Sequence, residues 1–317
     1  MQRYPRLLTL LFGLLFSIAL YFSVSTIVSL SGTVSRAGSS AAPQEYHLAL
    51  FIPDSPSRFF EEVLNGASRA ARSLGAALSV HRGGTESRSY RLAQYSGIDG
   101  AIIYPGSNLD EMRASLDRLK RAEIPLVLIE HGVTDDLPWP LVGTNTFDVG
   151  RKIGELAQDL TDEPLRMALV YSEKSPGIES EKDLVELGIN TSLADHLILP
   201  IIRKRTGLNP LDAEHLVYNL LHKGPEVDLL VFTDTNDTLA AVQVVIDLNL
   251  VGSVQIIGMG MNKAISDYLD RGILAGVIVV NPYRIGFDAV RVLLSHLREG
   301  YSAGYVDTGV EMIRGTP

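Results

Sequence analysis

Arg58, Phe59 and Phe60 are the residues whose types and spacing most suggest binding chemistry. They follow an apolar strand predicted at 47–52, and a helix begins directly after them with Glu61. Open α/β sheets bind ligands at the carboxyl ends of their strands, so two rings there could stack on a flat apolar ligand while the guanidinium donates hydrogen bonds. Alternatively, both rings form the first apolar turn of an amphipathic helix. The residues alone leave both interpretations open.

No catalytic or metal-binding motif accompanies these residues. The sequence lacks a Gly-x-Ser-x-Gly elbow, a His-Glu-x-x-His pair and a phosphate loop, and its seven histidines are scattered. Gly258-Met259-Gly260 resembles the start of a dinucleotide fingerprint, but Lys263 occupies the third glycine position. Glu130 and His131 are neighbours on a predicted strand and would point to opposite faces. We therefore predict a protein that is not an enzyme and that uses no cofactor and no metal.

Composition limits the remaining classes. The chain has 317 residues, of which 46% are hydrophobic and 21% charged, so it can build two folded lobes with cores of their own. Its formal net charge of −9 argues against a nucleic-acid partner. The absence of cysteine excludes disulfides, thiolate metal sites and a cysteine nucleophile.

The N-terminal region predicts export. Residues 7–30 carry no charge and form a run long enough to span a bilayer, which needs about 20 apolar residues. Two arginines precede this run, so the positive-inside rule places residues 1–6 in the cytoplasm and the bulk of the chain outside, in the periplasm or beyond the cell. We predict a single-pass membrane anchor followed by a flexible linker at 31–45. The alternative is a cleaved signal, with a site near 35–37, and a periplasmic product.

From residue 46 onward, strands and helices alternate. Buried strands are predicted at 100–104, 125–129, 167–171, 229–232 and 254–257, and helices such as 109–122 and 237–248 lie between them. Continuous apolar strands separated by helices imply parallel sheets that are covered on both faces. The sequence therefore predicts a doubly wound α/β fold.

Five segments, in consistent order, carry a resemblance to a known family. Residues 57–60 are similar to its Asn-Pro-Phe-Phe turn, 99–105 to its "DG-apolar-apolar" strand, 124–131 to its "IPV…DR" segment, 142–150 to its lobe-crossing segment, and 231–237 to its "ND" turn. From Tyr46 to about Leu297 the chain thus resembles the type I periplasmic sugar-binding proteins, which share their core with lac-repressor-like regulators. A predicted membrane span stands where the repressors carry their DNA-binding domain.

The resemblance implies two Rossmann-like lobes that close on a ligand by hinge motion. It places 46–144 and 282–300 in the N-terminal lobe, and 145–281 and 301–317 in the C-terminal lobe. The residues that it implies in ligand binding are Arg58, Phe59, Phe60, Glu130, His131, Lys182, Asn236 and Asp237.

Two positions depart from the family pattern. Gly260 and Val280 stand where the resemblance places an acidic residue and an amide. Each buried sugar hydroxyl without a partner costs ~1–3 kcal/mol, so these departures argue against an ordinary ribose-like ligand.

Together these features predict an extracytoplasmic solute-binding protein that captures a small, sugar-like ligand between its lobes. Its closed form would be read by a membrane partner, either an ABC permease or a sensor histidine kinase. The alternative is a degenerate pair of lobes that serves as a protein-interaction or sensory module without a small-molecule ligand.

Overall fold

The computed structural model describes residues 17, 18, 20, 21, 45–54, 57–83, 97–106, 109–133, 139–175, 178, 181–193, 196–198, 200–222 and 227–316. The chain divides into two units, Met1–Gln44 and Glu45–Pro317. The four described residues of the first unit are helical, whereas the rest of the predicted tail, anchor and linker lies outside the described residues. No helix within the described ranges combines the length and the apolar character that a membrane crossing requires.

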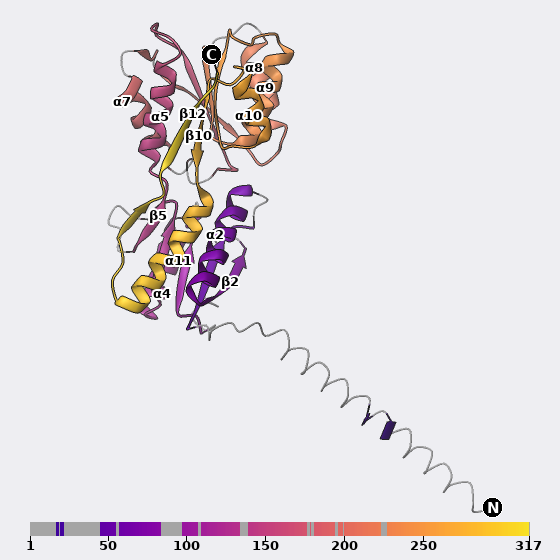
Figure 1. Ribbon diagram of the computed structural model, residues 1–317. Helices are drawn as coiled ribbons and strands as arrows, with labels where there is room; N and C mark the ends of the chain where they lie inside the picture. The colour runs from indigo at the N-terminus through magenta and orange to yellow at the C-terminus, as the bar shows by residue number, and fades with distance from the viewer. Residues whose placement is uncertain are drawn as a thin grey trace, which may run out of the picture. The chain divides into compact units, whose positions relative to one another are not determined.

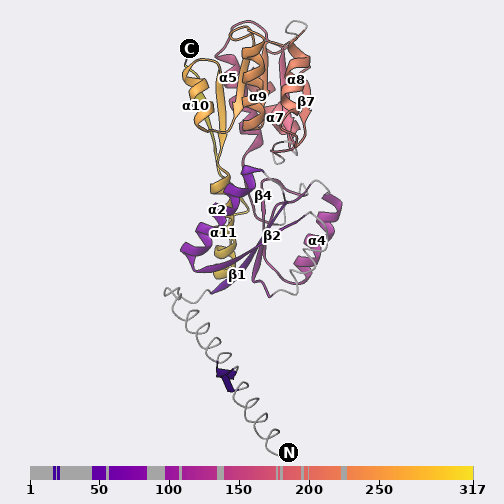
Figure 2. The ribbon, with the colours of Figure 1, turned by 90° about the vertical axis from the view of Figure 1, so that its right-hand side faces the viewer.

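The first lobe is built on a parallel sheet. Its strands lie in the order β11 (Tyr305–Asp307), β5 (Leu141–Gly143), β4 (Leu126–Ile129), β3 (Gly100–Ile103), β1 (Tyr46–Ile52) and β2 (Ala76–Arg82). Helices α2 (Arg58–Leu74) and α11 (Pro282–Glu299) pack on one face, and α4 (Leu109–Arg121) packs on the other. Figure 2 shows the strands between these helical layers. Alternate side chains of each strand therefore enter separate cores.

The second lobe repeats this plan. Its sheet runs in the order β12 (Val310–Arg314), β10 (Gly276–Val280), β9 (Gln255–Met259), β8 (Leu229–Phe232), β6 (Met167–Ser172) and β7 (Ile202–Thr206). All neighbours pair in parallel except β12, which is antiparallel to β10. Helices α5 (Thr146–Gln158) and α7 (Lys182–Leu193) cover one face, and α8 (Asp212–Leu221), α9 (Thr235–Asp247) and α10 (Lys263–Asp270) cover the other (Figure 1).

The α/β prediction of two lobes with parallel sheets is confirmed, and the predicted buried strands agree with the structure to within two residues. The sequence pattern missed strands such as β7, in which Arg203, Lys204 and Arg205 are exposed. Because β7 lies at a sheet edge, it does not need the continuous apolar run of a central strand.

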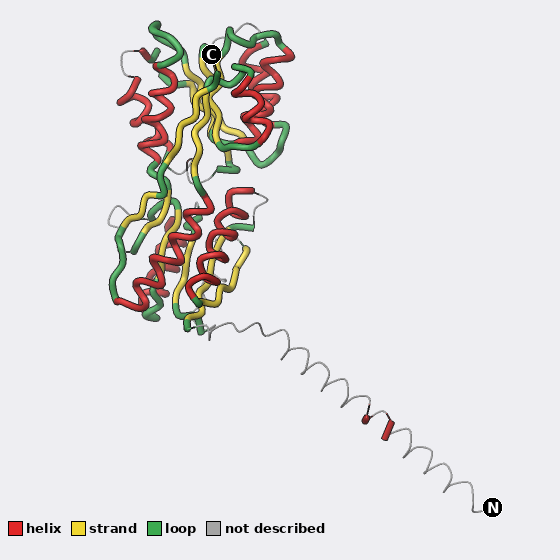
Figure 3. Tube along the Cα trace, in the orientation of Figure 1, coloured by secondary structure: helices red, strands yellow, loops and turns green. Residues whose placement is uncertain are grey.

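One predicted boundary is wrong. Residues 301–317 were assigned to the C-terminal lobe, but β11 pairs with β5 in the first sheet and only β12 joins the second. The chain therefore passes between the lobes after Asp307, beside the earlier passage at Thr144 and Asn145. The two passages are linked because the backbone N–H and the hydroxyl of Thr308 both donate to the Gly143 carbonyl, at 2.9 and 3.1 Å. Figure 3 shows these strands running from one lobe into the other.

Glycine brings helices unusually close in both lobes. A side chain at Gly66 or Gly286 would collide with the backbone of the facing helix in the α2–α11 pair. Gly150 and Gly188 play the same part in the α5–α7 pair. Each lobe thus has two helices in direct backbone contact.

Candidate functional site

A cleft with a volume of about 510 Å³ lies between the lobes. Small-molecule sites usually fall in this size range. Most of its lining residues follow the carboxyl ends of strands or begin helices, as expected for an open α/β sheet. Those with polar or aromatic side chains include Arg58, Phe59, Glu62, Glu130, Thr144, Lys174, Asp234, Asn236, Asn262, Asn281 and Tyr283.

Helices α2, α9, α10 and α11 all begin at the cleft. Their N-cap residues are Ser57, Asp234, Asn262 and Asn281, and each cap side chain accepts a hydrogen bond from a backbone N–H of its own helix. These residue types are preferred as caps because they satisfy N–H groups that have no partner within the helix. The same requirement therefore places polar side chains around the cleft.

The two adjacent phenylalanines have separate roles. Phe59 lines the cleft, whereas Phe60 is 2% exposed and belongs to the core of the first lobe. The Phe60 ring packs edge to face against Phe59 and against Tyr104, at centroid distances of 5.2 and 4.9 Å. Successive residues of a helix point in different directions, so one ring faces the cleft and the other faces the core. Phe60 is therefore removed from the predicted ligand set.

Glu130 lines the cleft and has an unusual backbone. It follows β4 with a φ angle of +73°, in the left-handed region that non-glycine residues rarely adopt. A side chain at Gly143 would lie 2.8 Å from the Glu130 Cα atom, so the neighbouring strand admits Glu130 only because it carries glycine there. Strained backbone of this kind clusters at functional sites.

The carboxyl group of Glu130 is buried, with 5% of the residue exposed. The Thr144 hydroxyl donates a long hydrogen bond of 3.5 Å to it. Burial, and secondarily the nearby Glu181, raises the pKa of Glu130 to about 8, although the Thr144 hydrogen bond acts in the opposite direction. At neutral pH this carboxyl group is therefore mostly protonated.

His131 and Lys182 do not line the cleft, contrary to the prediction. The His131 ring is buried against Tyr104, at a centroid distance of 5.2 Å. Burial lowers the pKa of His131 to about 4. The backbone carbonyl of Pro105 partly offsets this shift, although it forms no hydrogen bond of normal geometry with either ring nitrogen. Lys182 is the exposed first residue of α7. The lysine that does line the second lobe's side of the cleft is Lys174, just beyond β6.

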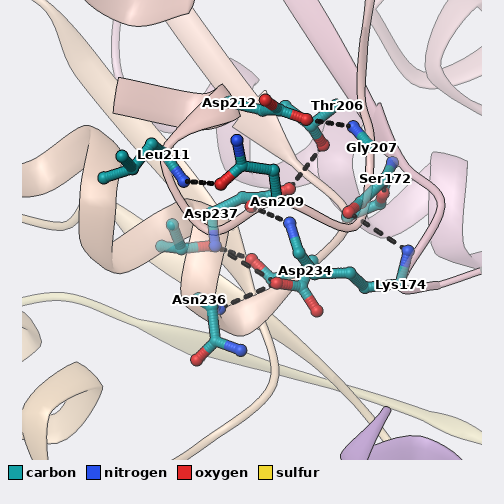
Figure 4. A network of polar contacts seen from close by, with 12 residues as sticks. Ser172, Lys174, Thr206, Gly207, Asn209, Leu211, Asp212, Asp234, Asn236 and Asp237 are labelled. Atoms are coloured by element: carbon teal, nitrogen blue, oxygen red, sulfur yellow. Dashed lines mark hydrogen bonds and ion pairs between the residues drawn. The ribbon is translucent and has the colours of Figure 1, made fainter. Parts of the chain in front are cut away.

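Lys174 forms a buried ion pair with Asp237. The distance from its Nζ atom to Oδ1 of Asp237 is 2.7 Å, and Asp237 is 1% exposed. The Thr206 hydroxyl donates to the other carboxylate oxygen at 2.5 Å (Figure 4). Asp237 therefore holds Lys174 and is not a cleft residue, in contrast to the prediction, whereas Asn236 next to it does line the cleft.

A direct hydrogen bond joins the two lobes at the cleft. The Ser57 hydroxyl donates to the backbone carbonyl of Lys174 at 3.0 Å. Ser57 begins α2 in the first lobe, and Lys174 follows β6 in the second. The two sides of the cleft are therefore in contact in this conformation.

The sequence prediction missed several cleft residues, namely Glu62, Lys174, Asp234, Asn262, Asn281 and Tyr283. Asn281 directly follows a strand, Asp234 and Asn262 follow strands within a few residues, and each caps a helix. A search for cap residues after buried strands would have found Asp234, Asn262 and Asn281.

The paired rings give a first test. Phe60→Ala should lower the free energy of unfolding by about 3–5 kcal/mol, because it leaves a cavity in the core. Phe59→Ala, which truncates a partly exposed ring, should cost clearly less. Chemical denaturation of both variants measures the difference, and equal losses would contradict the assignment of one ring to the core and the other to the cleft.

The pKa of Glu130 gives a second test. Because its folded-state pKa of about 8 exceeds the ordinary 4.5, the folded protein retains a proton that the unfolded chain releases. Stability from this group is complete below pH ~4.5 and falls as the pH rises toward 8, by up to about 1.4 kcal/mol per pH unit. Glu130→Gln lacks this loss, so its free energy of unfolding should increase relative to that of the wild type as the pH rises from 5 to 8. Chemical denaturation at several pH values measures this difference. A difference between the two proteins that stays constant from pH 5 to pH 8 would contradict the shift.

Comparisons with known proteins agree with this fold. The chain is similar to GanP, a glucose-galactose binding protein from Geobacillus stearothermophilus, with 20% identity and a TM-score of 0.73 over 85% of this chain and 97% of that chain. It is also similar to an ABC transporter solute binding protein from Burkholderia graminis in complex with D-arabinose, with 16% identity and a TM-score of 0.74 over 86% and 96% of the two chains.

A third similar structure is a solute binding protein from Agrobacterium vitis bound with alpha-D-tagatopyranose, with 18% identity and a TM-score of 0.70 over 85% and 95% of the chains. No curated protein matches the chain. Residues 48–301 match the family model described as the periplasmic binding protein domain. The chain therefore belongs to this family of solute-binding proteins, which confirms the prediction that it is not an enzyme.

Proposed function

We propose that the protein binds a sugar in the cleft and delivers it to an ABC permease. The observation that carries the proposal is a cleft of ligand size with amide, carboxyl and aromatic side chains from both lobes. Asn236, Asn262 and Glu130 offer hydrogen-bond partners for hydroxyl groups, while Phe59 and Tyr283 offer flat apolar surfaces. The sugars named with the similar structures support the same ligand class.

The charges of the cleft favour a neutral ligand. Its cationic side chains already have partners, because Arg58 lies 3.8 Å from Glu62 and Lys174 forms its buried pair with Asp237. The ion pair between Arg58 and Glu62 is exposed and weak, so the Arg58 side chain can change its conformation at little cost. A neutral polyhydroxy molecule can bind here without breaking either pair.

Part of the cleft is apolar. Val280, Met259, Met261 and Leu208 line it, together with Gly260. Gly260 has a φ angle of +81°, and a side chain there would collide with the Thr235 hydroxyl, so the local backbone is shaped for glycine. The ligand therefore has a face without hydroxyl groups on this side, which separates it from a simple pentose held by acceptors all round.

The protein would act outside the cytoplasm, held at the membrane through residues 7–30. A retained anchor keeps the lobes near the membrane partner, and it also suits the alternative in which a sensor histidine kinase reads the closed form. A ligand-free interaction module remains the second candidate, because Gly260 and Val280 remove polar groups from the cleft.

The test is a thermal-shift screen of the full chain, purified in mild detergent, against D-glucose, D-galactose, D-arabinose and D-tagatose. A ligand at 100 times its Kd should add ~2.7 kcal/mol of stability, which raises the Tm measurably. A panel without any shift, together with co-purification of a membrane partner, would favour the interaction module.

Asn236→Ala tests the site. The loss of its amide should weaken binding of the sugar that gives the shift by about tenfold or more, because a hydroxyl is left without a partner. Asn219→Ala is the matched control, since Asn219 is exposed on α8 outside the cleft lining. Calorimetric titration measures both, and equal affinities would place the ligand elsewhere.

A further inference from the structure

Glu130 differs from the neighbouring acids in having neither a cation nor a helix N-terminus as a partner. Glu62 faces Arg58, and Asp234 accepts backbone N–H groups of the first turn of α9. Asp237, which lies outside the cleft lining, faces Lys174. Among the described residues, no ion pair involves Glu130, and its carboxyl group accepts the long hydrogen bond from Thr144. A buried carboxylate without compensation is costly, whereas a buried carboxylic acid is much less so.

The groups around Glu130 also disfavour a negative charge. The half-buried Glu181, just before α7, interacts with it electrostatically and accepts a hydrogen bond of 2.6 Å from Thr146. Tyr305 on β11 stays a neutral phenol, because partial burial and then Asp307 raise its pKa to about 12. The adjacent His131 is buried and, with a pKa lowered to about 4, supplies no positive charge. Each neighbour is therefore acidic or neutral.

The backbone nevertheless directs this acid to the cleft. The left-handed conformation of Glu130 and the close approach at Gly143 are features that a purely structural carboxyl group would not require. One carboxyl oxygen meets Thr144, and the group as a whole lines the cleft. A carboxylic acid here has an O–H group that can donate to a bound molecule.

We propose that Glu130 recognises the ligand as an uncharged carboxylic acid that donates a hydrogen bond to an acceptor oxygen of the sugar, such as its ring oxygen. This inference rests on the proposed sugar-binding function. It also restricts the ligand class: the molecule must present a lone pair to Glu130, whereas an ionised carboxylate would instead require a hydroxyl donor. Binding then depends on a proton that the site already holds.

The proposal predicts the pH dependence of binding. As the pH rises above the value at which Glu130 ionises, the donor is lost and the Kd should rise by up to tenfold per pH unit. Glu130→Gln keeps an N–H donor of similar size, so its affinity should stay within about threefold of the wild type at pH 7 and remain flat to pH 10. Glu181→Gln removes the neighbouring acid. Without the negative charge of Glu181 nearby, Glu130 ionises more readily, so the rise in Kd should move to lower pH.

The experiment is calorimetric titration of the full chain with D-galactose and D-arabinose from pH 6 to pH 10. Glu214→Gln serves as the matched control, because Glu214 is exposed on α8 and does not line the cleft. It should reproduce the wild-type profile. A wild-type Kd that is flat or falls with rising pH would overturn the donor role, and so would a loss of more than tenfold in Glu130→Gln at pH 7.

A measurement without ligand separates this proposal from the function on which it rests. The infrared difference spectrum of wild type minus Glu130→Gln at pH 7 should contain the carbonyl band of a protonated carboxylic acid. If the band is missing while a sugar binds, the donor role is overturned and the sugar-binding function stands. If the band is present and neither sugar binds, the sugar-binding function fails and the donor role fails with it.

Discussion

Parallel pairing of the strands is the constraint on which the cleft depends. In each lobe the central strands run in one direction, so their carboxyl ends meet at one edge of the sheet. Side chains that follow different strands, such as Glu130 and Thr144 in the first lobe or Lys174 and Asn262 in the second, thereby line one cleft. Helices that start at the same edge need caps, and their polar cap side chains complete the lining.

Charge within the cleft follows from burial. Lys174 can be buried because Asp237 forms an ion pair with it, and the Thr206 hydroxyl donates a hydrogen bond to the other carboxylate oxygen of Asp237. Glu130 has no such compensation, so it responds by holding its proton instead. The same physical cost thus produces an ion pair on one side of the cleft and a neutral acid on the other.

The sequence predicted the central architecture because buried parallel strands are written as continuous apolar runs. It could not predict β11, whose three residues carry no such pattern and belong to the first sheet only through pairing with β5. It likewise could not separate Phe59 from Phe60, since that depends on how α2 is rotated against its sheet. The pair of Lys174 and Asp237 joins residues 63 positions apart, and no local pattern reveals it.

The glycine contacts within the helix pairs have a consequence for motion. Where the backbones of α2 and α11, or of α5 and α7, touch directly, no side chain is available to change rotamer and let the helices slide. We therefore expect each lobe to move as a rigid body. The chain also passes between the lobes near Asn281, where β10 of the second lobe leads into α11 of the first. Any change in the width of the cleft must be absorbed by torsions in the residues of the three passages, at Thr144 and Asn145, near Asn281, and near Thr308. We therefore expect the cleft to open by rotation of one lobe relative to the other about these passages, with little internal rearrangement of either lobe.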